Sequence, residues 1–233
     1  MATHIVNTVQ KVAVADRIFC NLPSAVADAI EQEAVTTTYP TGAVLFAEGQ
    51  AARGVFIVRR GKVKLSICGS DGRTLILRMV EAGDPLGVAA VVSGRPYEAT
   101  AETQEPSEIS FLRQSDLLRL MRAHGEIALW VTQHISADYA CTCREIRDLI
   151  LSDSASEKLA RLLVGWLDQN AAAKNPSQMK LALTHEEIGQ MIGTSRETVS
   201  RLFAGFKKQR LIQQSGATLV IPNRLALESL ITA

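Results

Sequence analysis

The sequence predicts an α+β protein in which an antiparallel β-barrel is followed by a long helix and a small C-terminal helical unit. Short extended segments separated by glycine turns fill residues 36–124, an unbroken helical periodicity follows over residues 126–151, and two short capped helices meet at a glycine turn within Leu183–Leu211. Short strands at near-regular spacing are typical of an antiparallel sandwich or barrel. We therefore expect four parts: a helical segment at 1–35, a barrel at 36–124, a long helix at 125–152 and a C-terminal unit at 153–233.

The composition is that of a folded globular chain. Of the 233 residues, 47% are hydrophobic and 21% are charged, which suits packed cores. The longest apolar run, Leu86–Val92, has seven residues, far fewer than a membrane span needs. The N-terminus lacks the pattern of an export signal. The four cysteines show no disulfide pattern, so we expect a protein of the reducing cytoplasm with no membrane partner: Cys20, Cys68, Cys141 and Cys143.

The charge distribution favours the C-terminal unit as the part that contacts phosphates. The net charge of the whole chain is only +1. Ten basic and seven acidic residues follow Ser152, a net of +3, which leaves −2 for the rest of the chain. This bias is mild, and it agrees with nucleic-acid binding by the C-terminal unit.

The barrel strands are predicted from alternation and turns. Lys62–Ile67 alternates strictly between polar and apolar residues, and Ser70-Asp71-Gly72 forms a hairpin turn before the return strand Thr74–Val80. Further extended segments are expected at Val44–Phe46, at Val55–Val58 and within Glu98–Leu112. A helix is expected at Asp116–Ala123, and Gly125 is expected to break the helical pattern after it.

The long helix, roughly Glu126–Leu151, carries an apolar seam in steps of four and three residues, as in a coiled coil. We call these positions the dimer seam: Ala128, Thr132, Ile135, Tyr139, Thr142, Ile146 and Leu149. Two threonines make the seam imperfect. The alternative is a helix that packs on its own barrel, and a helix of this length can do both.

Within Leu183–Leu211, one capping box marks the start of each of the two helices. Thr184 precedes Glu187 by three residues and Thr194 precedes Glu197 by three, while Gly193 lies between the helices at the turn. A similar pair, Ser154 with Glu157, is expected to start another helix at about Ala155–Asp168.

One face of the second helix carries side chains suited to base edges. An Arg can donate to guanine O6 and N7, and a Glu can accept from cytosine N4. Four such polar residues share the outward face near the helix start: Arg196, Glu197, Ser200 and Arg201. The alternative is an ordinary amphipathic helix with a solvated charged face.

A two-stranded wing is predicted after the second helix. Ser215-Gly216 is a tight hairpin turn between Ile212–Gln214 and Thr218–Ile221, and a last helix is expected at Arg224–Ile231. A short strand is expected at Met179–Leu183. Helix pair and wing together indicate a winged helix-turn-helix.

In this order and size, the parts resemble the cyclic-AMP receptor protein / fumarate-nitrate regulator (CRP/FNR) family of bacterial transcription factors. The most specific motifs are Glu187–Gln190 followed by Gly193–Arg201, supported by Gly83-Asp84 with Leu86-Gly87. The resemblance implies a jelly-roll barrel like a cyclic-nucleotide-binding domain and a homodimer joined along the long helices. It also implies that double-stranded DNA with a palindromic operator and RNA polymerase are partners.

The resemblance assigns the DNA contacts residue by residue. Arg196, Glu197 and Arg201 match the base-contacting positions of the cyclic-AMP type, while Glu197, Ser200 and Arg201 match those of the fumarate-nitrate type. Because both types share a TGA core, the operator is expected to contain TGA and its inverted repeat. Contacts to the DNA backbone are expected from Thr184, Ser195, Thr198, Ser215 and Gly216.

The sensory end departs from the cyclic-nucleotide binders. Val88 follows Gly87 where those members have Glu, and no Arg-Ser pair for the cyclic phosphate stands at Tyr97-Glu98 or at Glu98-Ala99. Glu98 would repel a phosphate. The adenine-contacting pair falls near Cys143-Arg144. The expected effector pocket is therefore Gly87, Val88, Tyr97, Glu98, Cys143 and Arg144, with an effector other than cyclic AMP.

Other cofactors are weighed by their ligands. Iron–sulfur members use several closely spaced N-terminal cysteines, but Cys20 stands alone there, so we expect no cluster. Haem remains an alternative, with His4, His124 and His134 as candidate ligands by residue type alone. No other metal site is predicted, and the barrel has either another small-molecule effector or none. Cys141 and Cys143 are expected to be inert, with cross-dimer pairing or oxidation as the alternative.

Two other classes of function compete with the regulator. A cupin-like enzyme would need a set of His and Glu metal ligands on barrel strands, yet no His lies between residues 5 and 123. A nucleotide-binding module that acts on a protein partner would leave the C-terminal helix pair unexplained. We expect a DNA-binding regulator and no enzyme.

Overall fold

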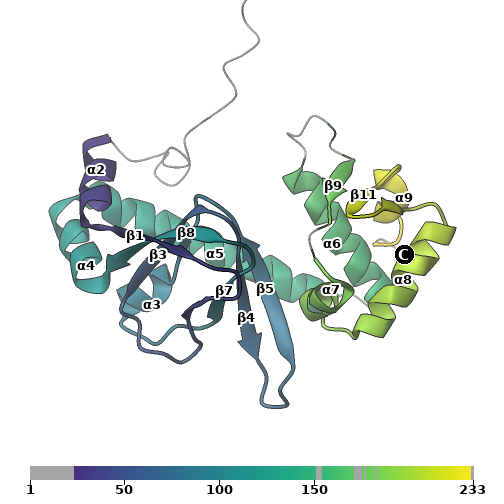
Figure 1. The fold of residues 1–233 in the computed structure, drawn as a ribbon, viewed down its shortest axis with the longest axis horizontal. Coiled ribbons are helices and arrows are strands. Elements are labelled where there is room, and N and C mark those ends of the chain that lie inside the picture. Colours follow the sequence, from purple (N-terminus) through teal and green to yellow (C-terminus); the bar gives the residue numbers. More distant parts are fainter. Residues whose placement is uncertain (1–23, 151–153, 171–174, 176, 182, 232–233) are drawn as a thin grey trace, which may run out of the picture. The chain divides into compact units, whose positions relative to one another are not determined.

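The computed structural model describes residues 24–150, 154–170, 175, 177–181 and 183–231. They fall into two compact units. The first extends to Ala140 without Gly69–Ile76, and the second contains Gly69–Ile76 together with the chain from Cys141 onward. The predicted α+β class is confirmed, with one difference: the β-strands form two sheets of a jelly roll and do not close into a single barrel (Figure 1).

The jelly roll has two four-stranded sheets. One has the order β1 (Val35–Tyr39), β8 (Ser107–Arg113), β3 (Gly54–Arg60) and β6 (Pro85–Leu86). The other has the order β2 (Val44–Phe46), β7 (Thr100–Thr103), β4 (Val63–Cys68) and β5 (Thr74–Val80). The registers that the structure gives are antiparallel, as in β1 against β8, where Val35 faces Phe111. The predicted turn after β4 is present, since the amide of Gly72 donates to the carbonyl of Gly69 at 2.9 Å.

Strand β3 is buried on both faces, which explains its unbroken apolar run. Val55 and Ile57 belong to a core shared with helices, whereas Phe56 and Val58 belong to the core between the two sheets. Side chains alternate across a strand, so a strand covered on both sides needs apolar residues at every position. Such burial contributes roughly 1.5–3 kcal/mol for each large apolar side chain.

The helices that accompany the jelly roll are α2 (Ser24–Glu33), α3 (Val88–Ser93), α4 (Gln114–Ala123) and α5 (Gly125–Ile150), and α5 continues past Ala140 into the second unit. The prediction that Gly125 breaks the helix is wrong: Gly125 is the first residue of α5, and the break is at His124, whose backbone is extended with φ −131°. Helix α3 and strand β1 were not predicted. The first turns of α5 bury Ile127 and Val131 in the core that contains Val55. Of the predicted helical segment at 1–35, residues 1–23 lie outside the described residues.

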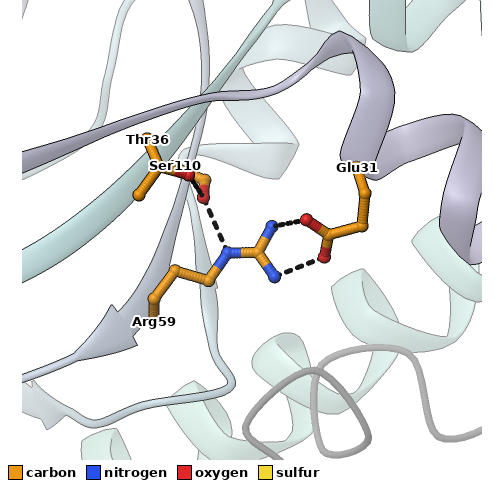
Figure 2. Close-up of polar contacts among 4 residues, drawn as sticks. All are labelled: Glu31, Thr36, Arg59 and Ser110. Carbon is orange, nitrogen blue, oxygen red and sulfur yellow. Dashed lines mark hydrogen bonds and ion pairs between the residues drawn. The ribbon is translucent and has the colours of Figure 1, made fainter.

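Helix α2 is fixed to the sheet by a charged cluster that spans three neighbouring strands (Figure 2). The guanidinium of Arg59 on β3 donates to both carboxylate oxygens of Glu31 at 2.5 and 2.8 Å. Its Nε donates to the Ser110 hydroxyl on β8 at 2.6 Å, and that hydroxyl lies 2.7 Å from the Thr36 hydroxyl on β1. Because a bidentate ion pair fixes the direction of the contact as well as its distance, this cluster orients α2 on the sheet. Ile30 of α2 is buried in the core.

The second unit contains a small helical core covered by a three-stranded sheet (Figure 1). Its elements are α6 (Ala155–Gln169), β9 (Gln178–Lys180), α7 (His185–Ile192), α8 (Arg196–Lys208), β10 (Gln213–Ser215), β11 (Thr218–Val220) and α9 (Arg224–Glu228). The sheet has the order β10-β11-β9. As predicted, Ser154 caps α6 by accepting from the amide of Glu157 at 3.1 Å. Among the described helices, none combines the length and the apolar character that crossing a membrane requires.

Candidate nucleic-acid interface

Helices α7 and α8 form a tight helix-turn-helix whose geometry is fixed by local contacts. Thr184 caps α7 in a complete capping box with Glu187, and Gly193 ends the helix in the left-handed region with φ 66°. A Cβ on Gly189 would lie 2.7 Å from the carbonyl oxygen of Thr194, so the turn passes directly against α7. The turn is therefore held close to α7, and the direction in which α8 leaves it is constrained.

The start of α8 differs from the predicted capping box by one residue. The N-cap is Ser195, whose hydroxyl accepts from the amide of Thr198 at 3.2 Å, and not Thr194. Thr194 instead belongs to the turn, where its amide donates to the carbonyl of Gly189 at 2.8 Å. Because Thr194 is engaged in the turn in this way, the N-cap falls one residue later, at Ser195.

Helix α8 buries one face and exposes the other. Val199, Phe203 and Phe206 are buried in the core of the unit. The four predicted base-contacting residues are all exposed: Arg196, Glu197, Ser200 and Arg201. Among the described residues, no ion pair involves Arg196, Glu197 or Arg201, so their charges are not neutralised by a contact within this part of the chain.

Glu197 is held in its ionised form. Its own backbone amide and the Ser195 hydroxyl beside its carboxylate lower the pKa of Glu197, as does the charge of Arg196, against an opposing effect of burial. At neutral pH the carboxylate is an acceptor, as a contact to cytosine N4 requires.

The residues predicted to contact the DNA backbone lie at helix starts and at the wing. Thr184 is exposed, but its hydroxyl is engaged with the Glu187 carboxylate at 2.9 Å. The hydroxyls of Ser195 and Thr198 lie 3.2 Å apart at the start of α8. Ser215 ends β10 opposite Thr218, and Gly216 follows it with φ 58°. Their roles in DNA binding stay predictions.

His185 was not singled out from the sequence, but it contacts the outward face of α8. It is the first residue of α7, and its Nδ1 lies 2.9 Å from the Ser200 hydroxyl oxygen. Its ring packs against Phe203 with centroids 4.7 Å apart. Burial, followed by the charges of Lys207 and Arg196, lowers the pKa of His185. The imidazole is therefore neutral at neutral pH.

The jelly-roll part of the predicted effector pocket is tightly filled. Tyr97 is 3% exposed, stacks on Phe46 with centroids 4.0 Å apart, and donates from its hydroxyl to the carbonyl of Gly54 at 2.6 Å. Val88 is buried in α3, and Gly87 caps that helix with φ 76°. A Cβ on Gly87 would lie 2.6 Å from the Tyr97 ring. Glu98, by contrast, is exposed.

The structure describes only some of the remaining candidate residues. Cys143 is exposed on α5, while the side chain of Arg144 lies outside the described residues. Of the candidate haem ligands, His124 and His134 are half-buried, and His4 lies outside the described residues, as does Cys20. Among the described residues, no group of three or more His, Cys, Asp or Glu side chains could hold a metal ion.

The dimer seam is largely exposed along α5. Tyr139 is 71% exposed and Ile146 is 50% exposed, and Leu129 next to the seam is 59% exposed. Thr132 and Thr142 are also exposed, whereas Ala128 and Ile135 are half-buried and the side chain of Leu149 lies outside the described residues. Ile135 also contacts the core of the first region. Among the described residues, this part of α5 therefore has one face in the core and carries exposed apolar side chains on another.

Comparisons with known proteins identify both parts of the chain. Residues 36–124 match the cyclic nucleotide-binding domain, and residues 157–230 match the Crp-like helix-turn-helix domain. The cAMP-activated global transcriptional regulator CRP of Haemophilus influenzae is 30% identical over 184 residues, which are 78% of this chain and 82% of that protein.

Solved structures share the fold. FixK2 from Bradyrhizobium japonicum has a TM-score of 0.76 at 24% identity, with 86% of this chain and 98% of that chain covered. A mutant of CooA from Carboxydothermus hydrogenoformans has a TM-score of 0.74 at 21% identity, with 91% of each chain covered.

Proposed function

Because the chain belongs to the CRP/FNR family of DNA-binding transcription regulators, we propose that it binds, as a homodimer, a palindromic operator with TGA-containing half-sites. The observation that carries this proposal is the exposed face of α8 with Arg196, Glu197, Ser200 and Arg201, backed by the buried Val199 and Phe203. A rigid helix that exposes such side chains at its start suits insertion into a major groove.

The chemistry of this face fits the G·C pair of TGA. The guanine presents O6 and N7 to an Arg, and its paired cytosine presents N4 to a carboxylate. The lowered pKa of Glu197 keeps its carboxylate ionised, so that it can accept a hydrogen bond from cytosine N4. Arg196 and Arg201 lie about 140° apart around the helix and mark the two edges of the face that carries Ser200 and Glu197.

The exposed dimer seam supports the homodimer. An apolar helix face with Tyr139 and Ile146 exposed to water is typical of an interface. Two-fold pairing along α5 would present two α8 helices to half-sites about one turn of DNA apart. On the same grounds of family, RNA polymerase is the proposed protein partner, and the division at 1–35, 36–124, 125–152 and 153–233 is the proposed domain organisation.

We propose an effector or a redox or gas signal other than cyclic AMP, although the Haemophilus relative is named as cAMP-activated. The support is chemical: a cyclic phosphate needs a cationic partner, whereas the matching positions hold the buried Val88, the buried Tyr97 and the acidic Glu98. Titration calorimetry with cyclic AMP should show no binding. Mass spectrometry and an absorption spectrum of protein from its host should identify a bound small molecule or a haem.

The test of the proposed function is binding to a TGA palindrome by fluorescence anisotropy. The matched control is the same duplex with both TGA cores changed to ACT. We expect specific binding to the first duplex, with an affinity that falls steeply between two salt concentrations because phosphate contacts release counterions. Equal affinity for both duplexes at both salt concentrations would reject the proposal.

A further inference from the structure

We propose that His185 sets the hydrogen-bonding direction of Ser200, and thereby the base that Ser200 selects in the operator. The inference rests on the proposed DNA binding by α8. It concerns a residue outside the predicted contact set, on the first helix of the pair and not on the second.

The imidazole of His185 makes two contacts with α8, one through Nδ1 and one through the face of its ring. Nδ1 of His185 lies 2.9 Å from the Ser200 hydroxyl oxygen, and within the described part of the chain this is the hydrogen bond that Ser200 makes with its side chain. The ring packs on Phe203, which is itself only 1% exposed. The capping box of Thr184 and Glu187 fixes the start of α7 directly before His185. The ring is therefore oriented by the core and by the helix start.

The protonation state of His185 decides what Ser200 can offer to DNA. A serine hydroxyl has one proton to donate and two lone pairs. When Nδ1 is unprotonated, it accepts the Ser200 proton, and the exposed oxygen presents lone pairs outward. When the imidazole is charged, Nδ1 must donate to Ser200, and the hydroxyl proton is then directed outward.

These two states favour different bases. An accepting Ser200 favours an exocyclic amino group, adenine N6 or cytosine N4, whereas a donating Ser200 favours an acceptor: guanine O6 or N7, thymine O4 or adenine N7. At neutral pH the imidazole is neutral, since burial and the cations Lys207 and Arg196 of α8 lower its pKa. The proposed accepting state is the neutral tautomer that carries its proton on Nε2. The acidic neighbours on α7 are Glu186 and Glu187, and the latter is engaged with Thr184. Helix α6, which also packs on α7, contributes none of the effects on this pKa among the described residues.

DNA brings one further charge to this environment. Phosphates near α7 stabilise the imidazolium, so the change in Ser200 should occur at a higher pH in the complex than in the unbound protein. The titration of Glu197 does not contribute to this change in base preference. Its pKa is lowered below the ordinary carboxyl value, so the carboxylate stays ionised over the pH range of the experiment.

The experiment measures base preference as a function of pH. Each half-site position is varied through the four bases, and the position where Ser200→Ala changes the preference is the one that Ser200 contacts. At about pH 8 the full-length wild-type protein should prefer A or C there by about three- to tenfold, as expected for one net hydrogen bond. At about pH 5.5 the preference should move toward G or T, and C should become the least favoured base.

Two variants separate this role from a structural one. His185→Ala should bind the operator with a preference that does not change with pH. His185→Asn, which can still bond to Ser200 but does not titrate, should also show a pH-independent preference and should keep more of the affinity. Nitrogen NMR of the imidazole should show an accepting Nδ1 at about pH 8 in the wild type and an altered resonance in Ser200→Ala.

The outcomes are distinct. An unchanged preference at both pH values with specific binding intact, or a shift that persists in His185→Ala, overturns this inference alone. If the wild type binds no TGA palindrome specifically at either pH, the proposed function fails and the inference fails with it.

Discussion

Arg78 on β5 and Asp138 on α5 form an ion pair, with Nη1 2.9 Å from Oδ1, that joins a jelly-roll strand to the long helix. His134, one turn earlier on α5, lies 3.3 Å from the other carboxylate oxygen of Asp138, and its ring stacks on Trp130. Both members of the ion pair are partly exposed, at 29% and 40% of their side chains. The pair therefore couples sheet and helix without being a buried charge.

We expect Asp138→Asn to lower the free energy of unfolding by about 0.5–1 kcal/mol at neutral pH, the range for a partly exposed pair. Burial alone would raise the pKa of Asp138, but the nearby His134 imidazole and the charge of Arg78 lower it overall. A lowered folded-state pKa gives stability that is present above the ordinary value of 3.8 and is lost as the pH falls through the folded value. Urea unfolding at neutral pH and at about pH 3 should show the difference between variant and wild type shrinking in acid.

The matched control is Glu108→Gln, which removes an exposed carboxylate of β8. It should leave stability within about 0.5 kcal/mol of the wild type. The prediction would be contradicted if the free energies of unfolding of Asp138→Asn and the wild type differed by the same amount at neutral pH and in acid.

A second prediction concerns the hydroxyl of Tyr97, which donates to the Gly54 carbonyl at 2.6 Å and accepts from the Gly54 amide at 3.3 Å. Tyr97→Phe should lower the free energy of unfolding by about 1–2 kcal/mol, because it removes a buried hydrogen-bond partner. Tyr39→Phe, at a half-buried tyrosine of β1, is the control and should change little.

The same tyrosine predicts a loss of stability in alkali. Burial raises the pKa of Tyr97, against the opposing effects of the Gly54 and Arg53 contacts. For a raised folded-state pKa, the stability is present below the ordinary value of 10.0 and is lost as the pH rises through the folded value. Urea unfolding across this range should show a smaller loss for Tyr97→Phe than for the wild type. Equal losses would contradict the prediction, because they would show that the pKa of Tyr97 is the same in the folded and unfolded states.

Much of the fold could be predicted because its signals are local. Thr184 and Glu187 form the expected capping box, and the alternation of Lys62–Ile67 corresponds to strand β4. Strand β1 was missed because its three central threonines lie on an exposed edge, where no apolar alternation is needed. Helix α3 was missed because six residues of mostly small apolar type give no helical period.

The contacts of the candidate site depend on tertiary structure to a greater degree. The outward face of α8 follows from its own periodicity, and its four residues are exposed as that periodicity requires. His185 and Ser200 are fifteen residues apart on different helices, so their contact depends on how closely α7 and α8 approach around Gly189. Arg78 and Asp138 are sixty residues apart, and no sequence pattern relates them.

A third prediction tests the outward face of α8. Arg201→Ala and Glu197→Ala should each weaken operator binding by about 1–3 kcal/mol per half-site, because each removes a contact to a base edge. Circular dichroism should show both variants folded, since both side chains are exposed. Arg122→Ala, which removes an exposed Arg of α4, is the control and should bind as the wild type does. Wild-type affinity for the TGA palindrome in either α8 variant would mean that another surface contacts the bases.

The last prediction concerns the dimer seam. Tyr139→Glu places a charge on the apolar face of α5, where pairing would bury it without a partner, and it should weaken dimerisation by about tenfold or more. Sedimentation analysis over a concentration series measures this change. Ala137→Glu is the matched control, because residue 137 is also exposed but lies roughly 160° around the helix from residue 139. A dimer as stable as the wild type in Tyr139→Glu, or equal weakening by the two substitutions, would show that the subunits do not meet along this face.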